Sequence, residues 1–336
     1  MSKKVKLGII GAGNMATNIH MPSIAELDNC EVVAICDLFE DKAKALAAKY
    51  GVKKTYALHP EMLKSEEMDA VVVLVNPDRT YWVANDCLRA GFHVLMEKPA
   101  GMNAFQAHSL ARTAEKMGKI AAVAMNRRHI PLIQEVLKRF EGQTITQVDG
   151  RFMKFSHIEE DWHYMSAYMA DIIHCTDLIR YLAGSEPADA ATVIGNFHSP
   201  VDNAWSSVIR FENGVTGTLR SNYQAAARFH DVEIHSPTVS AYINLGMGDL
   251  ECNAKIFYCG GQSMYSAAAK IAGSTTEEYL DAKELSGSSE YRIYYGYKAE
   301  NEDFINAILN GTEPLCPIAD AAKSMDMAEL LLEKHI

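Results

Sequence analysis

The chain has 336 residues, 48% of them hydrophobic and 22% charged, which is typical of a soluble globular protein with two domains or one large domain. Its formal net charge of -11 disfavours nucleic acid and anionic membranes as partners, because both attract basic surfaces. The longest purely apolar run, 70–75, is far too short to cross a bilayer, and the start of the chain is interpreted as a first strand rather than a signal peptide.

The seven cysteines give no sign of a disulfide framework or of a zinc site. Their number is odd, and no C-x-x-C pair occurs among them. We therefore expect free thiols, no bound metal and a reducing, cytoplasmic location.

From residue 5 to about residue 124, short apolar runs alternate with helical stretches. The helical stretches are 41–50, 80–90 and 103–117, and each is followed by a glycine that can end a helix in the left-handed conformation. Buried parallel strands read as apolar runs, which here cover 5–10, 31–37, 69–75, 92–97 and 119–125. The pattern predicts βαβ units and a doubly wound parallel sheet, that is, an α/β Rossmann domain over residues 1–124.

The first turn from strand to helix reads 11-GAGNMA-16. Here Gly11 permits a tight turn, Gly13 lets a pyrophosphate approach the backbone, and Ala16 is small enough for the helix to pack on the strand. The N–H groups at the start of the helix would then face the phosphates. The predicted phosphate-binding segment is Gly11, Ala12, Gly13, Asn14 and Met15.

Asp37 ends the second strand about 20 residues after this turn, as the dinucleotide-binding fingerprint requires. A carboxylate at this point can accept hydrogen bonds from both ribose hydroxyls, and it repels a 2′-phosphate. The next residue is Leu38, which cannot clamp such a phosphate. NAD is therefore favoured over NADP as the cofactor, with a solvated acid in a turn as the alternative interpretation of Asp37.

A strand that ends on two opposite charges and a proline occurs in 92-FHVLMEKPAG-101. Ligands of a doubly wound sheet bind outside the carboxyl ends of its strands, and Lys98 lies at such an end. A cation there can stabilise the alkoxide that develops on a substrate as hydride leaves. The alternative is an ordinary charged strand terminus.

With these motifs, the chain resembles the Gfo/Idh/MocA family of nicotinamide-dependent oxidoreductases, which act mainly on sugars and cyclitols. The resemblance extends over 76-NPDRTYWVANDCLRAGFHVLMEKP-99, 126-NRRHIP-131 and 304-FINAILNGTEP-314. It implies that Lys98 lies beside the nicotinamide and contacts the substrate hydroxyl. Glu97 would hold Lys98 in place or contact the cofactor, and Asn76 and Pro77 would lie near the inner half of NAD. Tyr81 departs from the family, where His is common, and Asn76 stands where Thr is usual.

Beyond residue 125, after a helix over 131–140, long segments favour β structure: 145–155, 189–199, 206–223 and 229–245. An Asn-Gly pair at 213–214 predicts a hairpin turn. We expect residues 125–336 to form an α+β domain for substrate binding and oligomerisation, with a large, mostly antiparallel sheet. Family members have such an open-faced sheet and often use it for oligomer contacts, which implies a homodimer or homotetramer. No structure is assigned to residues 255–300.

One helix is expected between these strands, over 166–184. Its apolar stripe consists of Ile172, Cys175, Ile179 and Leu182, and Asp171 and His174 share a neighbouring face. A helical histidine of this kind is more often structural than catalytic.

The resemblance gives His174 a second reading, because the family's catalytic helix reads roughly D-x-G-x-H-x-x-D. His174 and Asp177 match its second half, whereas Ala170 and Ile172 replace its first acid and its glycine. His174 is thus implied as the proton-transferring residue. Asp171 would replace the lost acid as an orienting or hydroxyl-binding group, and Asp177 is either functional or a surface or helix-packing acid. Some members use a tyrosine as acid/base, for which Tyr164 and Tyr168 are available.

Softer candidates for substrate contacts are Asn126 and Arg127 after the last Rossmann strand, and Trp162 with His163 before the helix. A hinge or core role is equally open for each. The first functional hypothesis is an NAD-dependent dehydrogenase of a sugar, cyclitol or related polyol. The alternatives are an NAD-dependent glycoside hydrolase with no net redox change, and a non-catalytic NAD- or sugar-binding protein.

Overall fold

The computed structural model describes residues 4–156, 158, 165–259 and 275–336. The chain forms two compact units, each assembled from several segments. Unit 1 comprises 1–129, 162–165 and 296–326, and unit 2 comprises 130–161, 166–295 and 327–336. The predicted roles of residues 1–124 and 125–336 in cofactor and substrate binding stay predictions.

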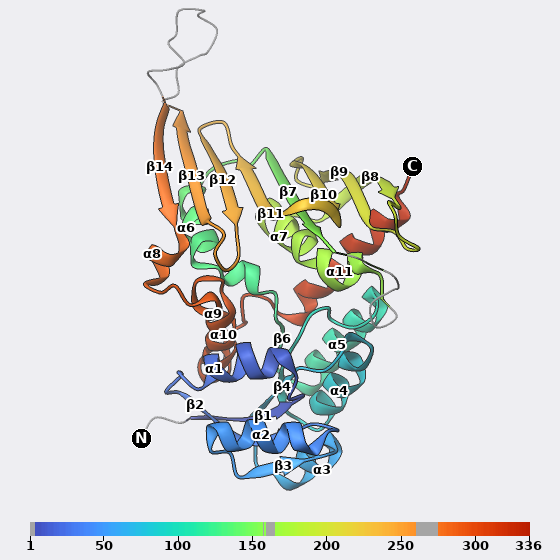
Figure 1. Cartoon of the computed structure of the whole chain (residues 1–336), viewed down its shortest axis with the longest axis vertical. Helices are drawn as coiled ribbons and strands as arrows, with labels where there is room; N and C mark the ends of the chain where they lie inside the picture. Colours follow the sequence, from blue (N-terminus) through green and yellow to red (C-terminus); the bar gives the residue numbers. More distant parts are fainter. Residues whose placement is uncertain (1–3, 157, 159–164, 260–274) are drawn as a thin grey trace, which may run out of the picture. The chain divides into compact units, whose positions relative to one another are not determined.

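Unit 1 contains a six-stranded parallel sheet in the order β3-β2-β1-β4-β5-β6 (Figure 1). The chain moves outward from β1 in one direction and then returns to the other side, so β1 and β4 flank the point where the strand order reverses. This confirms the predicted doubly wound fold. The strands are β1 (Val5–Ile10), β2 (Cys30–Cys36), β3 (Lys54–Tyr56), β4 (Ala70–Val73), β5 (His93–Met96) and β6 (Ala121–Val123).

The helices of unit 1 end and begin at the signals expected from the sequence. Gly51 and Gly118 adopt the left-handed conformation after α2 and α5. Asn103 caps α5 by accepting a 2.9 Å hydrogen bond from the backbone N–H of Gln106. The elements are η1 (Ala16–His20, a π-helical turn), α1 (Met21–Ile24), α2 (Glu40–Tyr50), α3 (His59–Ser65), α4 (Pro77–Arg89), α5 (Ala104–Met117), η2 (Asn126–His129) and α10 (Tyr297–Asn310), and α11 (Ile318–Glu333) begins in this unit.

Unit 2 contains an eight-stranded sheet in the order β14-β13-β12-β11-β7-β10-β9-β8. All neighbours are antiparallel except β7 and β10, which confirms the expected mostly antiparallel sheet. The predicted hairpin turn is present, with a 2.8 Å hydrogen bond from the Phe211 N–H to the Val215 carbonyl. The strands are β7 (Gln147–Phe155), β8 (Pro187–Gly195), β9 (Ala204–Phe211), β10 (Thr216–Asn222), β11 (Gln224–His235), β12 (Val239–Leu245), β13 (Cys252–Cys259) and β14 (Thr275–Asp281).

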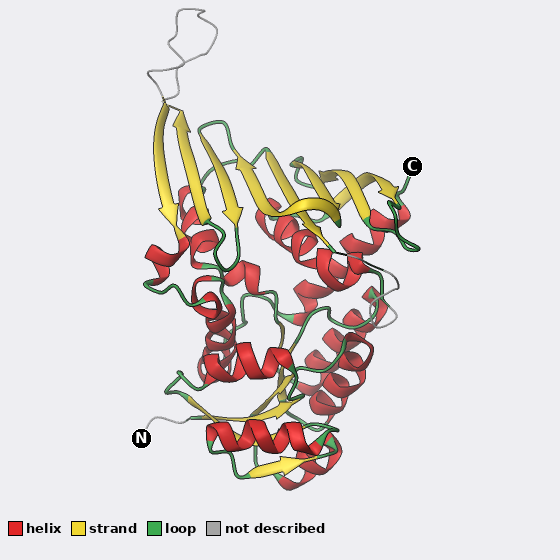
Figure 2. Cartoon of the chain, viewed as in Figure 1, coloured by secondary structure: helices red, strands yellow, loops and turns green. Residues whose placement is uncertain are grey.

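The helices of unit 2 lie on one side of this sheet (Figure 2). They are α6 (Pro131–Arg139), η3 (Tyr168–Ile172, a second π-helical turn), α7 (Ile173–Ala183), α8 (Ala282–Ser286) and α9 (Tyr291–Tyr294). Helix α7 packs so closely on β7 that a Cβ at Gly150 would lie 2.6 Å from Ile179 Cδ1 and 2.8 Å from Cys175 Sγ. We call the side of the sheet that α7 covers the inner face; on β7 it carries Val148, Gly150, Phe152 and Lys154, because side chains alternate along a strand. The predicted apolar stripe of this helix is buried as expected.

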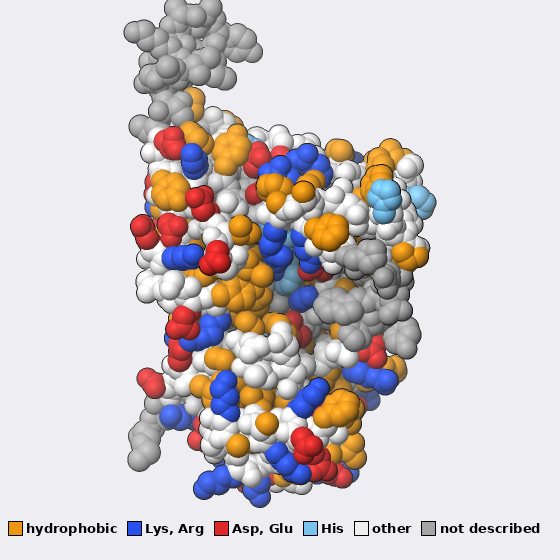
Figure 3. All heavy atoms as spheres, in the orientation of Figure 1, with side chains coloured by type: hydrophobic (Ala, Val, Ile, Leu, Met, Phe, Trp, Pro, Cys, Tyr) orange, Lys and Arg blue, Asp and Glu red, His pale blue; other side chains and the backbone are white. Residues whose placement is uncertain are grey.

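The surface is charged and mixed. Acidic and basic side chains both occur over unit 1 and unit 2 on the face drawn in Figure 3. Among the helices that the structure describes, none combines the length and the apolar character that a membrane span requires.

Candidate active site

The glycine turn has the geometry that a dinucleotide requires. Gly11 adopts φ +101°, and a Cβ added to it would lie 2.3 Å from the backbone carbonyl oxygen of Leu74, so only glycine fits. A Cβ at Gly13 would meet no atom of the described chain within 4 Å, which leaves open space at the point where a pyrophosphate would approach. Ala16 is completely buried against the sheet. The residues present therefore fit NAD.

Asp37 lies directly beside this turn. One carboxylate oxygen accepts a 2.7 Å hydrogen bond from the backbone N–H of Ala12, and the other accepts a 2.8 Å bond from the N–H of Phe39. Because each carboxylate oxygen can accept about two hydrogen bonds, both retain capacity for ribose hydroxyls. The following Leu38 is 76% exposed and offers no charge to a 2′-phosphate.

Asn76, Pro77, Glu97 and Lys98 follow the carboxyl ends of β4 and β5, the strand ends at which a doubly wound sheet binds its ligands. Asn76 is exposed at the start of α4, and Pro77 is the first residue of that helix. The Lys98–Pro99 peptide bond is cis. Tyr81, which stands where the family often has His, bonds the Ser109 hydroxyl at 3.1 Å and so joins α4 to α5.

Glu97 turns into the interior of unit 1. Its Oε1 lies 3.1 Å from Nε2 of the fully buried His20, and its Oε2 accepts a 3.1 Å bond from the backbone N–H of Lys98. The other ring nitrogen of His20 lies 3.0 Å from Asn301 Oδ1 on α10. Glu97 thus holds the backbone of Lys98 from the interior of unit 1. Sequence reasoning missed His20 and Asn301, which lie far apart in the chain.

A second carboxyl group, Glu300, lies in the same interior. It is 2% exposed, and neither carboxyl oxygen has a hydrogen-bond partner within the described chain. Burial and, to a lesser degree, the charge of Glu97 raise the pKa of Glu300 well above its ordinary value, against the attraction of Arg127. Burial thus favours the neutral form of Glu300 over the charged one.

The candidates of 126-NRRHIP-131 are buried in η2 of unit 1. Asn126 is 0% and Arg127 4% exposed. The adjacent Arg128 forms a 2.6 Å ion pair with Asp320 and also donates to the Leu315 carbonyl, which ties η2 to the start of α11. Arg128 is thus structural, whereas Arg127 lies in the field of Glu300.

In unit 2, Asp171 belongs to the π-helical turn η3, and His174 follows in the first turn of α7, where it is 6% exposed. One oxygen of Asp171 accepts two bonds, from Lys154 Nζ at 2.6 Å and from the Tyr223 hydroxyl at 2.6 Å. The residue that we expected to replace the family's first acid is therefore anchored to β7 and to the segment after β10. Asp177 is 1% exposed and is not a surface acid.

Of the two tyrosines considered as alternative acid/base residues, the structure describes only Tyr168. Tyr168 is fully buried, with its ring 5.3 Å from that of Trp205, and burial raises its pKa. A phenol enclosed in the core of unit 2 is not accessible to a substrate, which argues against Tyr168 as the acid/base. Trp162, His163 and Tyr164 lie outside the described residues.

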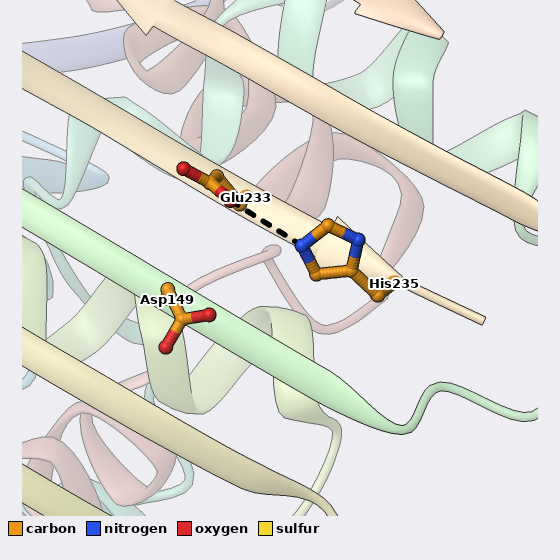
Figure 4. A group of neighbouring side chains, drawn as sticks. All are labelled: Asp149, Glu233 and His235. Atoms are coloured by element: carbon orange, nitrogen blue, oxygen red, sulfur yellow. Dashed lines mark hydrogen bonds and ion pairs between the residues drawn. The ribbon is translucent and has the colours of Figure 1, made fainter. Parts of the chain in front are cut away.

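A further group of titratable side chains lies on the opposite, outer face of the sheet, on β7 and β11: Asp149, Glu233 and His235 (Figure 4). His235 lies 3.4 Å from Glu233 and 3.0 Å from the Ser240 hydroxyl, and Asp149 accepts a 2.6 Å bond from Thr218. Glu233 and His235 bond each other, whereas Asp149 bonds the neighbouring Thr218. They lie on the face away from α7, which carries His174.

Comparison with known proteins agrees with this arrangement. A profile of an oxidoreductase family with an NAD-binding Rossmann fold matches residues 5–125, and a profile of the C-terminal domain of the same family matches residues 134–240. A myo-inositol 2-dehydrogenase of Thermotoga maritima is 24% identical over 235 residues, which are 66% of this chain and 69% of that one. A D-glucoside 3-dehydrogenase of Escherichia coli is 35% identical over 128 residues, 38% of this chain and 36% of that one.

Solved structures share the whole fold. A dehydrogenase from Chromobacterium violaceum superposes with a TM-score of 0.86 at 17% identity, covering 99% of this chain and 96% of that one. A levoglucosan dehydrogenase in complex with NADH gives a TM-score of 0.81 at 17% identity, covering 99% and 97%. With both of its domain profiles matched, this chain belongs to the Gfo/Idh/MocA family of NAD-binding oxidoreductases.

Proposed function

We propose that this oxidoreductase oxidises a hydroxyl-bearing carbon of a sugar, cyclitol or related polyol, or reduces the corresponding ketone. The observation that carries the proposal is the placement of three features at the carboxyl ends of one parallel sheet. The glycine turn follows β1, Asp37 follows β2 and Lys98 follows β5 by two residues. The named relatives act on cyclitol and glucoside hydroxyls, which supports this substrate class.

The chain's own residues take three roles in this proposal. His174 removes the hydroxyl proton as general base, a function that typically contributes ~10²–10⁴ in rate. Lys98 stabilises the negative charge that develops on the same oxygen. Asp171 orients His174 or holds a second hydroxyl of the substrate. When bound, NAD accepts the hydrogen of the reacting carbon as hydride.

Several residues would hold NAD. The backbone of the glycine turn and the carboxylate of Asp37 bind the adenosine half, and the acid selects NAD over NADP. Asn76 and Pro77 lie at the next strand end and would contact the inner half. Glu97 acts by holding the Lys98 backbone, in keeping with its bond to that N–H group.

The decisive test is Lys98→Ala. We expect turnover to fall by about 10²-fold or more, because the charge on the oxygen loses its partner, while NADH fluorescence titration shows binding unchanged. Lys64→Ala, which removes an exposed lysine of α3, serves as the matched control. Undiminished turnover by the Lys98 variant contradicts the proposed role.

Two rival functions have distinct outcomes. A glycoside hydrolase would release product without a proportional net gain of NADH. A non-catalytic sensor is motivated by Ala170, which replaces the family's first acid and is fully buried; it would bind NAD tightly and turn over no polyol or glycoside. NADH formed in proportion to ketone excludes both.

We further propose that the protein is a homodimer or homotetramer assembled through the outer face of the large sheet. Apolar side chains stand exposed on this face, including Val208 at 63%, Tyr242 at 46% and Tyr279 at 54%. Strand pairing places them in one row across the sheet, on which Asp149 and Glu233 also lie. Light scattering that gives a single species at the monomer mass of 37.1 kDa at micromolar concentration would contradict this.

A cytoplasmic location is part of the same proposal. All seven cysteines are free thiols, and six of them are buried. Titration of fewer than seven thiols in freshly purified, denatured protein would point to an oxidising compartment instead.

A further inference from the structure

Strand β11 carries an irregularity beside β7. Gln224 pairs with Phe155 and Phe229 pairs with Met153, so five residue steps on β11 face only two on β7. Such bulges interrupt the ladder and redirect side chains, and they are frequent next to active sites. Here the bulge precedes His230, whose ring stacks on Phe152 of the inner face at 4.1 Å. Arg228, two residues before His230, is thereby brought to the same face.

Arg228 is a partly buried cation with no acidic partner among the described residues. Its Nη2 lies 3.1 Å from His230 Nδ1 and 3.8 Å from the sulfur of Met247. Its Nε is buried and has no hydrogen-bond partner within the described chain. None of the carboxylates that the structure describes lies within ion-pair distance of this guanidinium. Since a guanidinium withdrawn from water is costly unless paired, Arg228 is suited to an anion supplied from outside.

A second cation lies on the same face. Lys154 pairs with Asp171 at 2.6 Å and lies 5.1 Å from the ring centre of Tyr223, whose hydroxyl also bonds Asp171. Burial, and then Asp171, raise the pKa of Tyr223, whereas Arg228 acts in the opposite direction, so the charge of Arg228 reaches the same phenol. Lys154 and Tyr223 thus bond the carboxylate of Asp171, one helical turn before His174, and Arg228 lies near the same phenol.

We propose that the substrate carries an anionic group, a carboxylate or a phosphate, which Arg228 binds with the help of Lys154 on the inner face of unit 2. The planar guanidinium matches such oxyanions with two parallel hydrogen bonds, and it keeps its charge at any physiological pH. The inference rests on the proposed function, because it assigns the substrate of that same site: an acidic or phosphorylated polyol rather than a neutral one.

Anion binding can be measured without knowledge of the substrate. Malonate and inorganic phosphate are titrated into the full chain with NADH present, by calorimetry and thermal shift. We expect saturable binding to the wild-type protein and at least tenfold weaker binding to Arg228→Gln, with partial recovery in Arg228→Lys. Arg89→Gln, an exposed change of equal charge on α4, is the control. Absence of saturable anion binding, or equal losses in Arg228→Gln and Arg89→Gln, overturns the inference.

Turnover then separates the two sources of the anion. NADH formation is followed with glucose, gluconate, glucuronate and glucose 6-phosphate. We expect a kcat/KM at least tenfold higher for a carboxylate or a phosphate than for glucose. In Arg228→Gln we expect the KM for that anion to rise 10- to 100-fold, with a smaller change in kcat.

The outcomes distinguish this inference from the proposed function. Equal use of neutral and anionic compounds refutes the anion site and leaves the dehydrogenase in place. Saturable anion binding without turnover of any polyol sustains the site and counts against the dehydrogenase. Should Arg228→Gln fail to fold, competition provides the readout: malonate or phosphate must raise the KM of the wild-type protein for its substrate, and failure to do so overturns the inference.

Discussion

The glycine turn of unit 1 and the inner face of the sheet in unit 2 are built in opposite ways. The turn is one contiguous segment, and its chemistry lies in backbone N–H groups and in the absence of side chains at Gly11 and Gly13. On the inner face, Lys154, Asp171 and Arg228 come from a strand, a π-helical turn and a bulge. The first arrangement is fixed by local conformation, and the second by strand register.

Substitutions in the two regions should therefore have different consequences. In the turn, the backbone geometry depends on Gly11 and the cofactor contact on Gly13. Single substitutions at these two glycines should therefore affect folding and NADH binding separately. On the inner face, each charged side chain is positioned by a partner from another segment, so removing one group leaves the remaining contacts in place. Paired variants in both regions test this contrast directly.

The largest effect is expected for Gly11→Ala. The added Cβ would lie 2.3 Å from the Leu74 carbonyl oxygen at a φ of +101°, so we expect a loss of about 3 kcal/mol or more in the free energy of unfolding. Gly13→Ala adds a Cβ that meets no atom of the described residues within 4 Å and should change stability by less than ~0.5 kcal/mol. It should nevertheless weaken NADH binding about tenfold or more, because the methyl group occupies the approach of the pyrophosphate.

Urea unfolding and NADH titration measure the two effects. The contrast between the glycines fails if both variants unfold at the same urea concentration, or if Gly13→Ala binds NADH as the wild-type protein does.

A smaller effect, dependent on pH, is expected for Glu300→Gln. A glutamate in an unfolded chain ionises near pH 4.3. Because burial raises the pKa of folded Glu300 above this value, the folded state holds its proton more tightly than the unfolded state. Stability should therefore fall by about 1.4 kcal/mol per pH unit as pH rises between the two values. The glutamine variant lacks this loss and should be the more stable protein at pH 7.

Thermal melts from pH 4 to 8 test this, with Glu302→Gln, an exposed change on the same helix α10, as the control. A stability difference between Glu300→Gln and the wild-type protein that does not vary with pH would show that Glu300 is not held protonated.

The sequence predicted those parts of the fold that depend on fixed spacing. Gly11 and Asp37 stand at offsets that the dinucleotide fold imposes, and the strand before Lys98 is a plain apolar run. Strand β3 was not predicted, because Lys54–Tyr56 is short and only partly buried. Residues 255–300 were left unassigned, although β13, β14 and three helices account for most of the described part.

Contacts between segments that are distant in the sequence could not be predicted from spacing. His20 and Asn301 are 281 positions apart, and no local sequence pattern predicts the hydrogen bond between them. Asp171 was singled out from its helical spacing, but its partners Lys154 and Tyr223 depend on the register of β7 and β10. Arg228 depends on a bulge whose position no turn residue marks.

The smallest effect is expected for Tyr223→Phe, which removes a hydroxyl that bonds the same oxygen of Asp171 as Lys154 does. Lys154 keeps that oxygen paired, and phenylalanine preserves the buried ring, so we expect a loss of about 1–2 kcal/mol in unfolding free energy. Tyr50→Phe, which removes the hydroxyl of a half-buried ring at the end of α2 in unit 1, should change it by less than ~0.5 kcal/mol. If Tyr223→Phe instead costs as much as Gly11→Ala, the inner face is as intolerant of single changes as the turn. The partner-by-partner positioning inferred for Asp171 would then be wrong.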